Sequence, residues 1–449
     1  MSATETIAAI ATPPGRGGIG IIRISGPRVA SIAKQILGKL PSPRYADYLP
    51  FLDSESQAID YGIALYFPAP KSFTGENVLE LQGHGGPVVL DMLLTRILDL
   101  GARLAHPGEF SEQAFLNGQL DLVQAEAIAD LIDSASIAAA TAAVRSLQGE
   151  FSKKIQEVKE ALVKVRIFVE SAIDFPEEEI DFLADSDIVE QVNKVSAVLI
   201  QILNQAKQGS LLREGMRIVL AGKPNVGKSS LLNRFANRDI AIVTPVAGTT
   251  RDVIREEINI DGLPLHIVDT AGLRHSDDMI EQEGVSRAWA EINSADHVLI
   301  VVDESNIDGD HLKQLIEELP THINRTVVFN KIDLGRHEPV VESRHYGTEI
   351  YLSAETGEGF DLLKTHLKKS MGFNDVSSSS FLARRRHLDA LRRALTHINT
   401  GLINYTDHHA AELFAEDLRQ AQNTLAEITG EFTSEDLLGR IFTSFCIGK

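Results

Sequence analysis

The chain has 449 residues, 43% of them hydrophobic and 24% charged, which is the composition of an ordinary soluble protein with a sizeable core. Its 43 lysines and arginines against 63 aspartates and glutamates give a formal net charge of −20, so its mean field repels phosphate and excludes general polyanion binding. The single cysteine, Cys446, excludes an internal disulfide framework, and the lack of a secretory signal or a bilayer-length apolar run predicts a cytoplasmic protein.

Residues 1–118 predict an α/β region. Short apolar runs rich in β-branched residues predict strands at 6–11, 20–25, 59–67 and 77–82, and segment 87–100 predicts a helix with one apolar face. The turn "GRGGIG" at 15–20 satisfies the dinucleotide pattern G-x-G-x-x-G by letter. It leads into a predicted strand rather than a helix, so we reject a dinucleotide site.

The rest of the chain reads as helices on both sides of an α/β segment. Apolar residues recur at steps of three and four along three long helices. They are Ile155, Val158, Leu162, Val165 and Val169; Ile188, Val192, Val195, Leu199 and Ile202; and Leu388, Leu391, Leu395, Ile398 and Leu402. Between them, 214–373 alternates strands and helices as parallel sheets do. We expect an N-terminal α/β domain at 1–118 and a helical domain (119–213 and 374–449) interrupted by an inserted α/β domain at 214–373.

The strongest motif opens the inserted domain. "MRIVLAGKPNVGKSSLLNRF" runs from a predicted strand through G-x-x-x-x-G-K-S, residues 222–229, into a predicted helix, and this context confirms a P-loop. Its glycines let backbone N–H groups surround phosphates at the start of a helix. Lys228 would neutralise phosphate charge, and the Ser229 hydroxyl would ligate Mg²⁺.

Three further segments follow in order and predict a Ras-like guanine-nucleotide domain. "GTTRD" supplies Thr250 as a second Mg²⁺ ligand, and "DTAG" supplies Asp269 and the Gly272 N–H beside the γ-phosphate. "NKID" supplies Asp333, whose carboxylate accepts two N–H bonds from guanine, which adenine cannot donate. The residues expected to contact GTP are Asn225, Val226, Gly227, Lys228, Ser229, Ser230, Thr244, Pro245, Val246, Ala247, Gly248, Thr249, Thr250, Asp269, Thr270, Ala271, Gly272, Asn330, Lys331, Asp333, Ser353 and Ala354.

Leu273 follows "DTAG", where Ras-like enzymes have a glutamine that orients the attacking water. The segments "GKPNVGKSS", "GTTRD" and "DTAGLR" resemble a branch of translation-associated GTPases with a hydrophobic residue here, several of which use potassium. The resemblance implies a K⁺ ion that stabilises transition-state charge as an arginine finger would. Its ligands would be Asn225, Thr244, Val246 and Thr249.

Water positioning then falls to a carboxylate farther along, for which we choose Glu281 as the catalytic residue. Asp277 and Glu283 are the next candidates. In the competing interpretations, Glu281 is a solvated surface charge, and Asn225 is a turn residue that bonds to its own loop.

Motifs along the whole chain resemble those of the MnmE (TrmE) family of tRNA-modification GTPases. They include "ATPPGRGGIGIIRISG", "FTGENVLELQGHGGP", "PGEFSEQAFLNG", "DLVQAEAIADLI", "AIDFPEEEIDF" and "GEFTSEDLLGRIFTSFCIGK". The resemblance implies a homodimer with a folate-binding, dimerising N-terminal domain and a G domain inserted into helices. It also implies a heterotetramer with the flavoprotein MnmG (GidA). Together they would build an aminomethyl or carboxymethylaminomethyl group on C5 of the wobble uridine, position 34, of certain tRNAs, with a one-carbon unit from a tetrahydrofolate.

The family's contacts to 5-formyltetrahydrofolate carry over to Arg23, Glu80 and Lys449. Gln119 holds the place of a further contact that is often a lysine, so that contact keeps a donor but loses its charge. For Lys449 to join this site, the tail must leave the helices and dock on an N-terminal domain, of its own or the partner subunit. Apolar residues of the tail would hold it there, and a disordered tail is the alternative. They are Ile441, Phe442, Phe445 and Ile447.

The arginine cluster near residue 390 and the single cysteine each allow two interpretations. Arg384, Arg385, Arg386, Arg392 and Arg393 are either a local nucleic-acid patch or a solvated helix start with intrahelical ion pairs. Cys446 is either a reactive thiol or a buried small hydrophobe. The terminal "CIGK" is a poor prenylation box, and we reject a lipid anchor.

Two rival functions share the G-domain motifs. A GTPase switch without chemistry of its own, such as a ribosome-assembly factor, predicts no folate site. A folate enzyme with a merely regulatory G domain predicts tRNA modification that does not need GTP hydrolysis.

Overall fold

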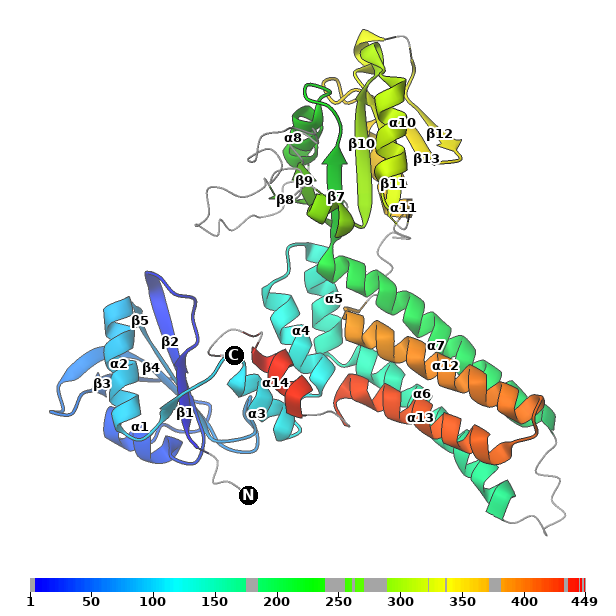
Figure 1. Cartoon of the computed structure of the whole chain (residues 1–449). Coiled ribbons are helices and arrows are strands. Elements are labelled where there is room, and N and C mark those ends of the chain that lie inside the picture. Colours follow the sequence, from blue (N-terminus) through cyan, green and yellow to red (C-terminus); the bar gives the residue numbers. More distant parts are fainter. Residues whose placement is uncertain are drawn as a thin grey trace. The chain divides into compact units, whose positions relative to one another are not determined.

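The computed structural model describes residues 5–174, 185–238, 255–260, 263–269, 289–321, 323–335, 337–370, 381–431, 435–443, 445 and 448. Contacts divide the chain into two compact units (Figure 1). The first comprises Met1–Ala129, Leu147–Ala184 and Thr396–Lys449, and the second comprises Asp130–Ser146 and Asp185–Leu395. Each unit therefore combines segments that are far apart in the sequence.

The first unit contains a six-stranded sheet in the order β3-β4-β5-β2-β1-β6. Its strands are β1 (Ile7–Ile10), β2 (Gly17–Ser25), β3 (Asp47–Leu52), β4 (Ala58–Phe67), β5 (Val78–Gly85) and β6 (Arg103–Leu104). The four strands and the helix predicted within 1–118 are present. Sequence reasoning missed β3, an edge strand whose Pro50 weakens the strand pattern.

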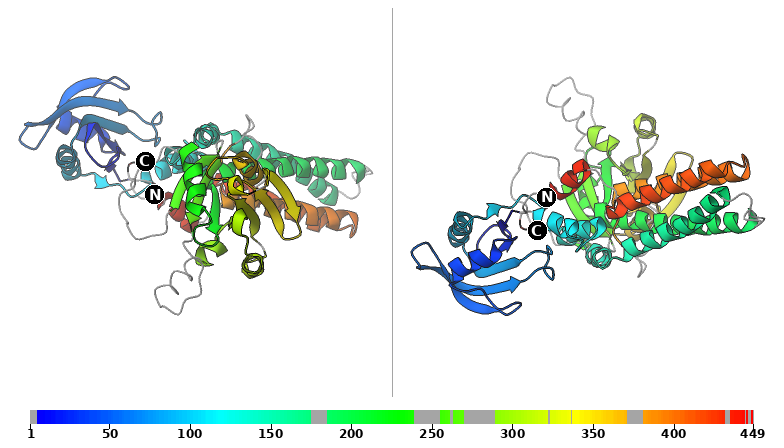
Figure 2. Two further views of the ribbon diagram at one scale, coloured as in Figure 1. Left: turned by 90° about the horizontal axis from the view of Figure 1, so that it is seen from above. Right: turned by 90° about the horizontal axis from the view of Figure 1, so that it is seen from below.

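Helices α1 (Val29–Leu37) and α2 (Pro87–Asp99) cover one face of this sheet (Figure 2). Ile22 and Ile24 of β2 are buried beneath them. Successive side chains of a strand point to opposite faces, so Arg23 lies on the face that these two helices leave uncovered. That face carries the second site described below.

Helices complete the first unit. They are α3 (Glu109–Leu116), α4 (Leu122–Ile132), α6 (Glu150–Asp174), α13 (Ala411–Thr429) and α14 (Glu435–Thr443), of which the last residues of α4 belong to the second unit. The face predicted from Ile155 to Val169 is buried on α6, which packs against α13. The Lys159 ammonium donates to the Glu431 carboxylate at 2.5 Å, so this buried lysine is paired across the two segments.

The second unit contains a seven-stranded sheet in the order β12-β13-β11-β10-β7-β9-β8, with parallel inner strands and an antiparallel strand at each edge. The strands are β7 (Met216–Ala221), β8 (Arg255–Ile260), β9 (Leu263–Asp269), β10 (His297–Asp303), β11 (Asn324–Asn330), β12 (Val340–Arg344) and β13 (Gly347–Tyr351). Its helices are α5 (Ile137–Leu147), α7 (Asp185–Glu214), α8 (Lys228–Arg238), α10 (Gly309–Glu318), α11 (Phe360–Ser370) and the start of α12 (Arg385–Thr406), with short turns η1 (Glu304–Asn306) and η2 (Ile332–Leu334).

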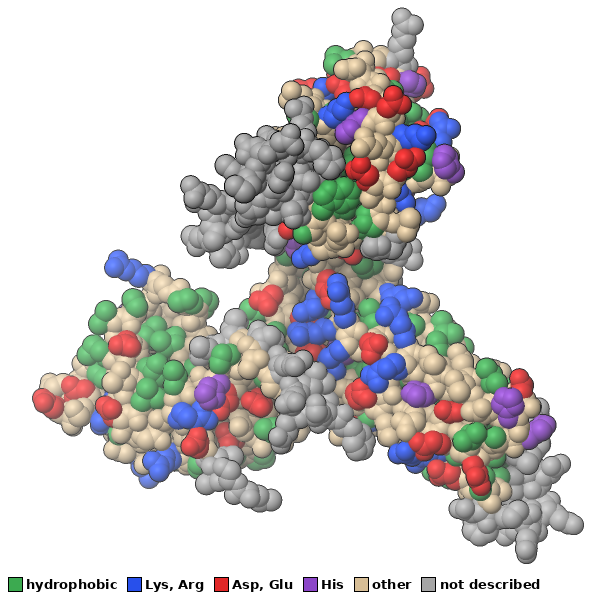
Figure 3. Space-filling model, viewed as in Figure 1, with side chains coloured by type: hydrophobic (Ala, Val, Ile, Leu, Met, Phe, Trp, Pro, Cys, Tyr) green, Lys and Arg blue, Asp and Glu red, His purple; other side chains and the backbone are tan. Residues whose placement is uncertain are grey.

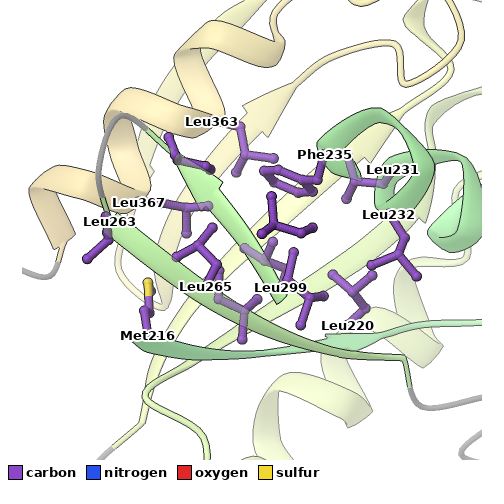
Figure 4. Packing of buried hydrophobic residues seen from close by; sticks show 14 of the residues in the cluster. Met216, Leu220, Leu231, Leu232, Phe235, Leu263, Leu265, Leu299, Leu363 and Leu367 are labelled. Atoms are coloured by element: carbon purple, nitrogen blue, oxygen red, sulfur yellow. The ribbon is translucent and has the colours of Figure 1, made fainter. Parts of the chain in front are cut away.

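Alternation along the strands builds a core on each face of this sheet. Leu220 of β7 packs with Phe235 of α8 and Leu363 of α11 on one face (Figure 4). Val219, its neighbour in sequence, packs on the other face with Leu315 of α10. The three layers confirm the inserted α/β domain, and with it the predicted fold class.

Candidate functional site

The P-loop joins the end of β7 to the start of α8, at the edge of the sheet where the parallel strands end. Gly222 has φ +140° and Gly227 has φ +97°, a region that favours glycine. A Cβ on Gly227 would lie 2.1 Å from Nδ2 of Asn330, and one on Gly222 would lie 2.3 Å from the Val301 carbonyl oxygen. The loop therefore needs both glycines, for conformation and for space.

Asn330 joins the P-loop to the loop after β13. Its Nδ2 donates to the Val226 carbonyl at 2.9 Å, and its Oδ1 accepts from the Ala354 N–H at 2.8 Å. The residue ends β11 and is 2% exposed, so both bonds are made out of water. Three segments that are separate in the sequence are thereby held in one arrangement.

Lys331, the next residue in the chain, also links the end of β11 to the P-loop. Its backbone has φ +70°, and its ammonium donates to the Asn225 carbonyl at 2.8 Å and to the Asp303 carboxylate at 2.6 Å. Burial alone would raise the pKa of Asp303, but the hydrogen bonds from Lys331 and Ser305 outweigh it and hold the pKa below its usual value. Sequence reasoning missed Asp303; the signal was an acidic residue at the carboxyl end of a parallel strand.

Lys228 is buried within the P-loop and donates to the carbonyls of Gly222 at 2.8 Å and Lys223 at 3.0 Å. The next two predicted contacts, Ser229 and Ser230, are exposed in the first turn of α8. Backbone N–H groups at such a helix start favour anions.

The segment expected to hold the guanine base has one exposed and two buried members. Asp333 is exposed in η2, with its carboxylate open to solvent. Ser353 and Ala354 are buried, and the Ser353 hydroxyl accepts from the Thr356 N–H at 3.1 Å. Sequence reasoning missed Arg234 of α8, whose guanidinium donates to the Ala354 carbonyl at 2.9 Å and so supports this loop from the P-loop helix.

Much of the predicted catalytic apparatus lies outside the described residues. This holds for Thr244, Pro245, Val246, Ala247, Gly248, Thr249, Thr250, Thr270, Ala271, Gly272, Leu273, Asp277, Glu281 and Glu283. Asp269 ends β9, and only its backbone is described. The Asn225 side chain is exposed, and it makes no hydrogen bond to any other described residue. The described contacts therefore do not support the competing interpretation, in which this side chain bonds to its own loop.

The residues predicted to bind folate gather on the open face of the first sheet. Arg23 of β2 and Glu80 of β5 are directly opposite in register, and Nε of Arg23 lies 3.0 Å from Oε1 of Glu80. The Arg23 guanidinium also lies over two rings, 5.2 Å from the centroid of Phe73 and 5.7 Å from that of Phe110. Phe110 is fully buried and Phe73 is half-buried, so these rings support the guanidinium from the protein interior, and the ion pair is the polar part of the site.

The carboxyl-terminal tail reaches this site within the same chain. The Gly448 carbonyl accepts from Nη1 of Arg23 at 3.3 Å, and a Cβ on Gly448 would lie 2.5 Å from the Ile10 carbonyl oxygen of β1. Upstream, Phe442 and Phe445 are buried beside Gly108 at the start of α3. The tail therefore docks on its own N-terminal region. Lys449, Ile447 and Cys446 lie outside the described residues.

Gln119, the fourth predicted folate residue, is exposed beside the loop that carries Phe73. A Cβ on Gly75 of that loop would lie 3.2 Å from Cγ of Gln119, and Nε2 of Gln119 donates to the Asn117 carbonyl at 3.3 Å. Asn117 in turn donates from Nδ2 to the Thr74 carbonyl at 2.7 Å. Gln119 thus borders the same region as Arg23 without a described contact to it.

Together, the parallel sheet, the glycine-dependent P-loop and the loop after β13 that Asn330 ties to it define the class of P-loop GTPases. Two family descriptions match the sequence, "MnmE helical domain" at residues 122–446 and "GTP-binding protein TrmE N-terminus" at residues 6–119.

Curated relatives match from end to end. The chain is 58% identical over 449 residues to the tRNA modification GTPase MnmE of Hydrogenovibrio crunogenus, covering 100% of both chains. It is 58% identical over 451 residues to that of Pasteurella multocida (99% of this chain, 100% of the relative) and 59% identical over 454 residues to that of Yersinia pseudotuberculosis (100% of both). The chain therefore belongs to the family of tRNA modification GTPase MnmE, as its motifs predicted, and it is a GTP hydrolase. None of the described helices is long and apolar enough to cross a membrane.

Proposed function

We propose that this chain is a potassium-activated, magnesium-dependent GTPase that modifies tRNA together with a flavoprotein partner. The observation that carries the GTP site is the pair of buried hydrogen bonds from Asn330 to Val226 and Ala354, with the Lys331 contact to Asn225 beside it. These bonds pre-organise the phosphate loop and the base-recognition loop before nucleotide arrives, which lowers the ordering cost of binding.

Asp333 reads the base in this proposal. Its exposed carboxylate can accept from the N1–H and the exocyclic amine of guanine, and the neighbouring Ser353–Ala354 loop is held by Arg234. Asp333→Asn should therefore weaken guanine binding and favour xanthine nucleotides, because an amide can donate to the oxygen that replaces the amine. Competition binding with GTP and xanthosine triphosphate measures this preference, and an unchanged preference would contradict the role of Asp333.

The proposed metal ligands are hydroxyl, amide and carbonyl oxygens, which suit Mg²⁺ and K⁺. Mg²⁺ would be held by Ser229 and Thr250, and both ions would supply positive charge to the phosphates. Asn225 fits its proposed part in a K⁺ site, since its φ of +65° leaves the side chain exposed while Lys331 occupies its carbonyl. Thr244, Val246 and Thr249 are the other K⁺ ligands we propose.

Hydrolysis rates in matched KCl and NaCl test the potassium proposal. The rate should be high in K⁺ and low in Na⁺, because the smaller ion fits an oxygen cage of this kind poorly. Turnover per molecule should also rise with protein concentration if ordered loops let two G domains of the homodimer meet. Equal rates in the two salts would end the potassium proposal.

Glu281 is the residue we propose to position the attacking water. Glu281→Ala should leave GTP affinity nearly unchanged and lower kcat by about 100-fold or more, since the group acts only in the transition state. Asp277→Ala and Glu283→Ala are matched controls from the same segment. Wild-type turnover in the Glu281 variant would instead assign the positioning of the water to Asp277 or Glu283.

For the tRNA chemistry we propose a folate site formed by Arg23, Glu80, Gln119 and Lys449. The Glu80 carboxylate suits the N–H edge of a pterin, and Arg23 and Lys449 suit the carboxylates of 5-formyltetrahydrofolate or a related tetrahydrofolate. The register pairing of Arg23 with Glu80 supports this choice, because it sets a cation and a carboxylate side by side on one face of the sheet. The one-carbon unit would then reach C5 of the wobble uridine, position 34.

Further expectations come from the same family. The chain would act as a homodimer and as a heterotetramer with the flavoprotein MnmG (GidA), in the cytoplasm. We propose domain boundaries at 118, 213 and 373, with the N-terminal part serving folate binding and dimerisation. Reconstitution with the flavoprotein, followed by mass spectrometry of tRNA nucleosides, tests the reaction.

A GTPase switch without chemistry of its own remains the rival function. Equilibrium dialysis against 5-formyltetrahydrofolate separates the two, because a switch predicts no binding. Comparing nucleoside modification with GTP and with a non-hydrolysable analogue separates a GTP-driven reaction from a folate enzyme with a merely regulatory G domain.

A further inference from the structure

The first turns of α12 concentrate positive charge in an acidic chain. Arg384, Arg385, Arg386, Arg392 and Arg393 surround a single aspartate, Asp389, which gives this stretch a net charge of +4 while the whole chain carries −20. Figure 3 shows Lys and Arg side chains gathered on this face of the molecule, over the start of α12. An isolated basic surface on an acidic protein is where a polyanion can approach.

Four of these arginines lie on one side of the helix. Arg385, Arg392 and Arg393 are exposed and Arg386 is half-buried. Residues 385 and 386 lie two turns before 392 and 393, about 10 Å along the axis at 1.5 Å per residue. The opposite side of the helix, including Leu388, Leu391 and Ile398, is buried. We call Arg385, Arg386, Arg392 and Arg393 the α12 arginine stripe.

The start of α12 is held in place by ion pairs to other helices. The Asp130 carboxylate of α4, itself buried, accepts from Arg213 of α7 and from Arg384, each at 2.8 Å. Glu214 of α7 accepts from Arg385 at 3.0 Å. Arg384 is therefore a structural residue, and the helix that bears the stripe is fixed where three chain segments converge.

Two ion pairs that the stripe makes, those of Arg385 and Arg393, are solvent-exposed and exchangeable. Arg385 is 84% exposed, and Arg393, which is 44% exposed, pairs one turn earlier with Asp389, which is 65% exposed. Exposed pairs of this kind contribute little stability and are screened by salt. A phosphate can take their place, and a guanidinium binds its oxygens with two parallel hydrogen bonds.

We propose that the α12 arginine stripe binds the phosphodiester backbone of tRNA. This inference rests on the proposed function, which requires tRNA to reach the chain. The charge of the rest of the surface repels nucleic acid, so a backbone contact must be local, and the stripe is a local basic surface on a fixed helix. Contacts to phosphate orient the substrate without reading its sequence.

The test is tRNA binding by the full chain, measured by fluorescence anisotropy over a series of salt concentrations. Arg392→Glu/Arg393→Glu should weaken the Kd at least tenfold. It should also reduce the slope of log Kd against log salt concentration by about two, since each lost phosphate contact reduces that slope by about one. Circular dichroism checks that the variant is folded.

A matched control reverses the same charge elsewhere. Lys194 pairs with Glu190 on α7 and Lys313 with Glu317 on α10, both as exposed pairs one turn apart like Arg393 and Asp389. Lys194→Glu/Lys313→Glu changes the net charge equally and should alter the Kd less than twofold. An equal loss in both variants would show only the effect of net charge and would overturn the proposal.

Other outcomes separate the proposal from the function on which it rests. If wild-type protein is active in reconstituted tRNA modification and the stripe variant binds tRNA normally, the stripe proposal is wrong and the function stands. If the stripe variant binds tRNA normally but loses the flavoprotein in a pull-down, the stripe is a protein-docking surface instead. If wild-type protein neither binds nor modifies tRNA, the function and the stripe proposal both fail.

Discussion

At the nucleotide site, the described contacts join the carboxyl ends of parallel strands of one sheet: Asn330 and Lys331 at the end of β11, Asp303 at the end of β10, and the P-loop after β7. The Arg23 site is assembled differently. It pairs two antiparallel strands across an open sheet face and adds a tail carbonyl from Gly448, 425 residues away in sequence.

The difference explains why the two sites leave different traces in sequence. Parallel strands end at one edge of a sheet, so loops that follow them meet without further instruction, and each loop carries its own short motif. A site on a sheet face depends on strand register, and a docked tail depends on packing far along the chain. The nucleotide site should therefore lose affinity when its buried hydrogen bonds are removed. The Arg23 site should lose affinity when the docked tail is removed or the Arg23–Glu80 pair is broken.

Removing the tail should have the largest effect. Deletion of residues 446–449 should abolish binding of 5-formyltetrahydrofolate, because it removes Lys449 and the Gly448 carbonyl bonded to Arg23, while GTP hydrolysis continues. Equilibrium dialysis and a phosphate-release assay measure the two activities. The control Lys449→Ala keeps the tail docked and isolates the terminal charge. Normal folate binding by the truncated protein would remove the tail from the site.

The second prediction breaks the nucleotide site alone. Asn330→Ala leaves the Val226 carbonyl and the Ala354 N–H buried without their partner, which destabilises the two loops by about 3 kcal/mol. GTP binding must then order these loops, so the affinity for GTP should fall by up to roughly 100-fold. Fluorescent-nucleotide titration measures it. Asn324→Ala, at the exposed start of the same strand, is the control. Folate binding should stay normal; a parallel loss there would mean that the two sites are not independent.

A smaller effect is expected from the Arg23 pair. Glu80→Gln keeps the shape but removes the charge that Arg23 faces, so folate affinity should fall about 10- to 100-fold, as for the loss of a charge-assisted hydrogen bond. Glu55→Gln, on the exposed turn between β3 and β4, is the matched control. An unchanged affinity would show that Glu80 only orients Arg23.

The smallest effect near neutral pH is on stability and belongs to the nucleotide-binding unit. His297, 1% exposed at the start of β10, bonds through Nε2 to the Thr326 hydroxyl at 2.8 Å, and His366 bonds to the same hydroxyl. Burial, with a contribution from His366, lowers the pKa of His297 to about 3. The unfolded chain therefore binds the extra proton first as pH falls below about 6.5.

Stability contributed by neutral His297 is complete above pH 6.5 and is lost between 6.5 and about 3, at about 1.4 kcal/mol per pH unit. Denaturant unfolding followed by Trp289, the only tryptophan, reports this unit because that ring packs on the core beside β10. His297→Gln should flatten the pH dependence, whereas His345→Gln, on the turn between β12 and β13, should not. A wild-type midpoint that does not change from pH 7 to pH 5 would contradict the prediction.

The sequence by itself determined most of the architecture and the class of the protein. The P-loop motif, the "NKID" motif and the apolar periodicities are local patterns, and local patterns predict helices, parallel strands and the loops between them. The predicted face of α6 is buried, and the structure places Asn330 and Lys331 against the P-loop at the strand ends. Asp303 and Arg234 were not predicted, because a single charged residue at a strand end or within a helix has no distinctive spacing.

Only the tertiary structure decided which pieces complete the other surfaces. It showed that the tail reaches Arg23 of its own chain, a choice that the sequence left open between two subunits. It also added to the picture of the basic segment, where Arg393 pairs with Asp389 within the helix as one interpretation expected, while Arg384 and Arg385 pair with Asp130 and Glu214 of other helices. Both outcomes depend on contacts between residues more than 150 positions apart, and such contacts arise from the packing of whole elements rather than from any local pattern.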